Sequence, residues 1–276
     1  MRYGVVLPGG TASRQLAQAE AAERAGWDAV FVWETGYGVD PWSLLSAMAV
    51  RTQQVRLGTL LTPAPWRRPW KLASQIATLD QLSSGRAIVT LGLGAVSDDL
   101  PSTGETTDLR ERAARLDETI DLLRTLWAGG IEHHGTYFDV VCPGWLVEAA
   151  APVQQAIPIW VAGAWPRPRS MQRALRCDGV VAEWHLGRAN DLHGGTPEDL
   201  RDLCRWLSEH GSNVEMDVIC QGETPTEDPA AAAAHVASWG TAGCTWWMET
   251  RWGSAESAED RLGAMDARMA AGPPTA

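Results

Sequence analysis

Apolar runs of strand length alternate with helical patterns along almost the whole chain. Eight such runs are mainly apolar, at residues 3–8, 28–33, 55–61, 87–94, 157–163, 178–184, 215–222 and 244–250. Continuous runs of this kind, without a polar residue at every second position, are typical of parallel strands that helices cover on both faces. The pattern therefore predicts a parallel α/β architecture.

The segments between these runs repeat their apolar residues at the spacing of an α-helix. The longest stripe advances in steps of three and four residues, at Leu109, Ala113, Leu116, Ile120, Leu123 and Trp127. Three segments open on an N-cap side chain followed by proline, at Asp40-Pro41, Thr196-Pro197 and Asp228-Pro229. Such pairs favour the start of a helix, because the cap accepts a free backbone N–H and proline needs none. Further helices are predicted at residues 12–25 and at about 255–270.

Eight β/α units within 276 residues fit a (β/α)8, or TIM, barrel. The rival doubly wound sheet usually opens on a GxGxxG turn, and residues 7–13 contain only Gly9-Gly10. We predict one barrel domain over residues 1–270, followed by a disordered tail at 271–276. Residues 129–156 interrupt the alternation before the fifth strand, and we interpret them as a short insertion that contains a small hairpin.

Charge and composition exclude several classes of function. The net charge of -11 and the pI near 5.0 argue against a nucleic-acid-binding surface. No stretch approaches the roughly 18 apolar residues that span a bilayer, and the N-terminus lacks the pattern of a signal peptide. We therefore expect a cytoplasmic protein without a membrane partner. The five cysteines form no CxxC pair and the histidines are scattered, so we predict neither a disulfide framework nor a metal site.

Candidate chemistry lies where the predicted strands end, because barrel enzymes build their active sites from the loops at that face. Four ionisable side chains occupy such positions and are our candidates for general acid–base catalysis: Glu34, Glu183, His185 and Glu249. Histidine titrates near neutral pH, and burial raises the pKa of a carboxyl group toward the same range. A structural role is the open alternative for each of them.

Four segments, in order along the chain, carry a resemblance to a known family. They are residues 19–34, 40–94, 110–140 and 152–164. Together they resemble the bacterial luciferase-like family of flavin-dependent monooxygenases and oxidoreductases. The resemblance implies a barrel whose flavin or deazaflavin lies at the carboxyl ends of the strands. Only residues 185–196 separate the sixth strand from the next helix, which implies a shortened lid over the substrate.

The resemblance also suggests where the cofactor would bind. The ring face would rest on Thr59, Leu60 and Leu61, with Gly94 opening the loop over which the cofactor lies and with Ser97 and Asp98 at the ring edge. For the phosphate we favour a turn that enters a helix, where backbone N–H groups and arginine attract an anion. Its residues are Gly163, Ala164, Trp165, Arg167, Arg169 and Ser170.

Three functions remain open at this point. The first is a monooxygenase that uses reduced FMN and dioxygen on a small organic substrate, with a separate flavin reductase as a possible partner. The second is hydride transfer with coenzyme F-420, although lysines that hold its phosphate in some relatives are absent here except for Lys71. The third is a flavin-binding barrel without catalysis. By resemblance we expect a homodimer.

Overall fold

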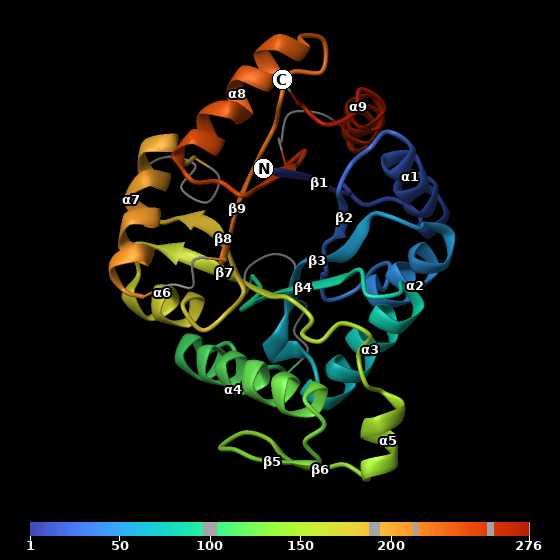
Figure 1. The fold of residues 1–276 in the computed structure, drawn as a ribbon, viewed down its shortest axis with the longest axis vertical. Coiled ribbons are helices and arrows are strands. Elements are labelled where there is room, and N and C mark those ends of the chain that lie inside the picture. The colour runs from blue at the N-terminus through green and yellow to red at the C-terminus, as the bar shows by residue number, and fades with distance from the viewer. Residues whose placement is uncertain (96–103, 188–193, 212–214, 253–256, 276) are drawn as a thin grey trace.

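Eight parallel strands form a closed barrel in the computed structural model, which describes residues 1–95, 104–187, 194–211, 215–252 and 257–275 (Figure 1). The strands are β1 (Arg2–Val6), β2 (Ala29–Val32), β3 (Arg56–Pro63), β4 (Ala87–Gly92), β7 (Ile159–Trp165), β8 (Gly179–Trp184), β9 (Asp217–Gly222) and β10 (Trp246–Glu249). Each pairs with its neighbour along the chain, and β10 returns to pair with β1. The predicted (β/α)8 barrel is confirmed.

Helices surround the barrel and cover the outer face of its strands (Figure 1). They are α1 (Ala12–Arg24), α2 (Pro41–Arg51), α3 (Pro69–Leu82), α4 (Leu109–Trp127), α6 (Pro168–Ala174), α7 (Pro197–Glu209), α8 (Pro229–Ala242) and α9 (Ala258–Ala270), with a 3-10 turn η1 (Ala64–Trp66) before α3. Asp40, Thr196 and Asp228 each accept a backbone N–H at the start of their helix, as predicted. Within the described ranges, no helix is long and apolar enough to cross a membrane.

The predicted insertion lies outside the ring of helices, beside α4 (Figure 1). It consists of the hairpin β5 (Glu132–His134) and β6 (Asp139–Val141), as predicted, and the short helix α5 (Gly144–Ala149). Two carboxylates fasten it to the barrel. Glu118 of α4 accepts the backbone N–H groups of residues 136–138, and the fully buried Asp80 of α3 accepts those of residues 153 and 154. The limits of the domain and of the tail remain predictions.

Aromatic side chains fill the interior of the barrel. Phe31 stacks on Trp160 with ring centroids 5.4 Å apart, and Trp160 meets Trp246 edge-on at 5.3 Å. All three side chains are fully buried and belong to an inner cluster that is separate from the larger core between strands and helices. The burial of rings of this size supplies much of the hydrophobic stabilisation. The rings also fill the part of the barrel that lies farther from the carboxyl ends of the strands.

Gly58 shows how little room the inner layer leaves. A Cβ atom at this position would lie 2.2 Å from the carbonyl oxygen of Ile88 and 3.0 Å from the ring of Phe31. We expect Gly58→Ala to lower the free energy of unfolding by about 1–3 kcal/mol, because backbone atoms cannot move aside. Urea denaturation measures the change. The matched control is Gly263→Ala on α9, where nothing lies within 4 Å and stability should be unchanged or slightly raised. Equal effects of the two substitutions would contradict this packing.

Candidate active site

A cavity of about 680 Å³ opens above the aromatic interior, where the strands end. Its walls come from β2, β3, β7 and β8, from the loop after β4 and from the first turns of α4. It contains nine of the residues that the sequence predicted, namely Glu34, Leu60, Leu61, Gly94, Ala164, Arg167, Ser170, Glu183 and His185. The predicted Ser97 and Asp98 lie outside the described residues.

Five predicted residues do not line this cavity: Thr59, Gly163, Trp165, Arg169 and Glu249. The cause for most of them is the alternation of side chains along a strand, which sends every second residue outward. Thr59 is fully buried and bonds to Thr62, Gly163 packs under Val180 and Met171, and Trp165 packs edge-on against Trp206 of α7. Arg169 is exposed on the surface of α6.

A bulge in β3 shapes one wall of the cavity. The pairing of β3 with β4 shifts register between Thr59 and Thr62, and the Leu60–Leu61 peptide bond is cis. The side chain of Leu61 then lies over Gly92 of β4. A Cβ atom added to Gly92 would lie 2.6 Å from Cδ2 of Leu61. Gly94, at φ +72°, packs in the same way against Pro63. The two glycines at the end of β4 therefore make room for the bulge of the neighbouring strand.

Glu34 is held by an arginine. Its side chain is 5% exposed, and Arg67 donates from Nε to its Oε1 at 2.5 Å. Burial raises the pKa of Glu34 above its ordinary value, while the charge and hydrogen bond of Arg67 act in the opposite direction. Its second oxygen, Oε2, is buried without a hydrogen-bond partner among the described residues. Glu34 therefore reaches the cavity as a partly satisfied ion pair.

Glu183 lies on the inner face of β8, two residues beyond the interior Val181. It makes no hydrogen bond or ion pair with any described residue. Burial alone raises the pKa of Glu183 to about 7. His185 follows it at the cavity wall, and its backbone N–H donates to the carbonyl oxygen of Trp165 at 2.8 Å. Of the four predicted acid–base residues, Glu183 has the environment most typical of a proton carrier.

Glu249 has a different environment at the end of β10. It is fully buried outside the barrel, where Arg251 donates to its Oε1 at 2.6 Å. The backbone N–H and the hydroxyl of Thr224 donate to its two oxygens, both at 2.8 Å. Arg268 lies 3.8 Å from Oε2. This carboxylate joins the last strand to the loop after β9 and to α9, and it does not reach the cavity where we expected it to act.

The sequence missed several residues that line the cavity. Arg112 of α4 is 2% exposed and donates to the carbonyl oxygens of Leu93 and Gly94. Arg173 of α6 is also buried and pairs with Asp117 at 2.7 Å. Trp66, Gln221 and Trp252 also line the cavity and were not among the predicted site residues. A signal existed for Arg112, because it stands three residues after Leu109 on the apolar stripe, where a charge is unusual.

The polar atoms around the cavity fit the ring of a flavin or deazaflavin. Buried atoms without a partner in the described structure include Nε1 of Trp33, Nε1 of Trp66, Nε of Arg112 and Oε2 of Glu34. An unsatisfied buried polar group costs about 1–3 kcal/mol, and native structures contain few of them. Three donors and one acceptor at one cavity complement the two carbonyl groups and the N–H group on one edge of such a ring.

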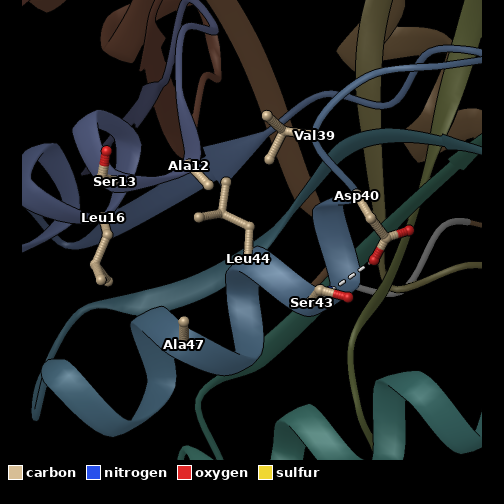
Figure 2. Close-up of a pocket in the computed structure, with 8 residues that line it drawn as sticks. All are labelled: Ala12, Ser13, Leu16, Val39, Asp40, Ser43, Leu44 and Ala47. Atoms are coloured by element: carbon tan, nitrogen blue, oxygen red, sulfur yellow. Dashed lines mark hydrogen bonds between the residues drawn. The ribbon is translucent and has the colours of Figure 1, made fainter.

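A second hollow, of about 440 Å³, lies between the first turns of α1 and α2 (Figure 2). Small and aliphatic side chains such as Ala12, Leu16 and Leu44 line it, and Asp40 points toward Ser43, whose backbone N–H it accepts at 2.8 Å. It contains none of the predicted site residues. The described residues also include no group of three or more histidine, cysteine, aspartate or glutamate side chains that could hold a metal ion.

Comparison with known proteins identifies related sequences over most of the chain. The family described as luciferase-like monooxygenase matches residues 1–268. The F420-dependent glucose-6-phosphate dehydrogenase of Amycolatopsis mediterranei is 33% identical over 63% of this chain and 50% of its own length. The oxygenase component of the flavin-dependent trigonelline monooxygenase of Acinetobacter baylyi is 30% identical over 61% of this chain and 48% of its own length. The chain thus spans about half the length of these curated relatives.

Solved structures with this fold are less similar in sequence. The monooxygenase RslO1 from Streptomyces bottropensis superposes with a TM-score of 0.78 at 20% identity, over 98% of both chains. An F420-dependent secondary alcohol dehydrogenase in complex with an F420-acetone adduct superposes with a TM-score of 0.76 at 16% identity, again over 98% of both. At this level of identity the likeness establishes the shared fold.

The burial of Glu183 without a partner among the described residues predicts that stability falls as pH rises. The ordinary pKa of 4.5 applies to the unfolded chain, so folding keeps a proton on Glu183 between about pH 4.5 and 7. The free energy of unfolding should therefore fall as pH rises through this window, by up to about 3 kcal/mol from this group.

Chemical denaturation of the wild type and Glu183→Gln at pH 4.5 and pH 8 measures this contribution. The variant should be the more stable of the two at pH 8, and the difference should shrink at pH 4.5. Glu209→Gln, at the exposed end of α7, serves as the control and should show no such trend. A difference that stays constant between the two pH values would contradict the burial of Glu183.

Proposed function

This chain belongs to the luciferase-like monooxygenase family, and we propose that it is an oxidoreductase that binds coenzyme F-420 in the cavity and transfers hydride. The observation that carries the choice of cofactor is sequence similarity. Dehydrogenases named as F420-dependent are 30–34% identical to it, and that of Beutenbergia cavernae aligns over 83% of this chain and 69% of its own length. From the sequence alone we expect reduced FMN, with coenzyme F-420 as the alternative, so the relatives change the order of the two cofactors.

The cavity supplies a place for each part of such a cofactor. The Leu60–Leu61 bulge offers a flat apolar surface for the ring, next to the unsatisfied donors of Trp33 and Trp66. Arg167 and Ser170 lie at the β7 side of the cavity and would hold the phosphate. Arginine can replace the lysines of some relatives in this role, because it binds phosphate with two parallel hydrogen bonds.

Bound coenzyme F-420 would accept or donate the hydride, and the side chains of the chain would handle the proton. Glu183 is suited to this task because a carboxyl group with a pKa near 7 can both take and return a proton at neutral pH. His185 lines the same wall and provides a second titratable group. Trp33, Trp66 and Leu109 contribute apolar surface to the cavity.

Monooxygenation with reduced FMN is the second candidate. The 30% identity to the oxygenase component of trigonelline monooxygenase supports it. In that case the same ring surface would bind FMN, and a separate flavin reductase would supply the reduced cofactor. The apolar walls would then keep water away from the oxygen chemistry. A homodimer remains part of either proposal.

Fluorescence titration of the purified protein with coenzyme F-420 and with FMN, each oxidised and reduced, tests the proposal. Arg112→Gln should weaken binding of the preferred cofactor by about tenfold or more, because it removes a buried cation that fixes the loop at Gly94. Arg110→Gln, on the exposed side of the same helix, is the matched control and should bind like the wild type. Preferential binding of reduced FMN would contradict hydride transfer with coenzyme F-420 and favour monooxygenation. Binding of neither cofactor would overturn both.

A further inference from the structure

Glu183 differs from the other carboxylate that lines the cavity because it has no partner among the described residues. Glu34 pairs with Arg67, and Arg173 pairs with Asp117. Arg112 donates to two backbone carbonyl oxygens, and Arg167 is exposed to water. Glu183 contacts the cavity without a hydrogen bond or counter-charge among the described residues. An ionised carboxylate in such surroundings is costly unless something that enters the cavity neutralises it.

The surroundings of Glu183 suit a positively charged group. Val181 lies on the same face of β8, and Ala162 and Leu60 contribute further apolar surface to the same cavity. The indole ring of Trp33 also lines it. Aromatic faces attract ammonium groups, with a gain that grows when water is excluded. A cation in the part of this cavity that the cofactor leaves free would have Glu183 as its counter-charge.

A hollow beside the cavity carries more acidic than basic side chains. A neighbouring hollow of about 380 Å³ shares Glu34, Thr35 and Trp66 with the cavity, so the two adjoin. Its ionisable side chains are Glu34, Asp40, Glu105, Tyr37 and Arg67, so acidic groups outnumber the basic one. These acidic groups would attract a cation to this side of the cavity, whereas the arginines of the cavity itself, Arg112, Arg167 and Arg173, suit the phosphate of the cofactor.

We propose that Glu183 is the counter-charge for a substrate that carries a positively charged nitrogen, as a protonated amine or a quaternary ammonium group. The proposal rests on the proposed function, because it assigns the substrate class of the same cavity. Burial raises the pKa of Glu183 in the empty cavity, and a cation bound beside it would lower that pKa and favour the ionised carboxylate. Glucose 6-phosphate, the substrate named for the F420-dependent relatives, is an anion and could not take Glu183 as its counter-charge.

Binding of matched ligands tests the proposal. The probes are choline with its neutral carbon isostere 3,3-dimethylbutan-1-ol, benzyltrimethylammonium with neopentyl-benzene, and glucose 6-phosphate as the anion. Isothermal titration calorimetry follows each ligand with the protein alone and with the protein loaded with its preferred cofactor. We expect at least one cation to bind about tenfold more tightly than its isostere, and we expect glucose 6-phosphate to bind more weakly than that cation in the cofactor-loaded protein.

Variants connect this preference with Glu183. Glu183→Gln should abolish the preference for the cation, Glu183→Asp should retain part of it, and Glu209→Gln should leave it unchanged. Circular dichroism shows whether each variant is folded. Equal binding of cation and isostere, a preference that survives in Glu183→Gln, absence of cation binding, or tighter binding of glucose 6-phosphate than of the cation to the cofactor-loaded protein would each overturn the proposal. Cofactor titration of the same samples shows separately whether the proposed function fails.

Discussion

The rest of the structure depends on the filling of the barrel interior. A closed ring of eight parallel strands leaves a space at its centre, and side chains must occupy it to native density. Phe31, Trp160 and Trp246 occupy the lower part of this space. Above them the inward positions are held by Glu183, Leu60 and smaller groups, so a cavity remains. The cavity therefore exists where the aromatic packing ends, and its floor is as rigid as the core.

Much of the fold could be predicted from the sequence, because continuous apolar runs and N-cap–proline pairs are local signals. The site was harder to predict, because it depends on which face of a strand each side chain occupies. Glu183 and Glu249 both stand at the end of an apolar run, yet Glu183 points into the barrel and Glu249 lies outside it. A run that is apolar on both faces contains no information about this difference.

The bulge in β3 shows a second limit of sequence reasoning. Leu60 and Leu61 were predicted to form the ring surface, and both line the cavity, whereas the adjoining Thr59 does not. A regular strand would alternate the three residues between its faces, and the register shift breaks this rule. The bulge depends partly on another strand, where Gly92 leaves room for Leu61. No local pattern at residues 59–61 therefore predicts it. Arg112 was missed for a similar reason, since its partners are the carbonyl groups of a distant loop.

The way in which the insertion before β7 is attached has a consequence for the evolution of this protein. Glu118 and Asp80 hold it through backbone N–H groups, which every residue except proline possesses. None of residues 129–156 lines the cavity. Mutations and changes of length in this segment should therefore leave the chemistry unchanged, provided that the two carboxylates keep their N–H donors and that Phe138 and Val140 keep their packing against Leu122. The segment is a part of the chain where lineages can diverge while the barrel and its cavity stay the same.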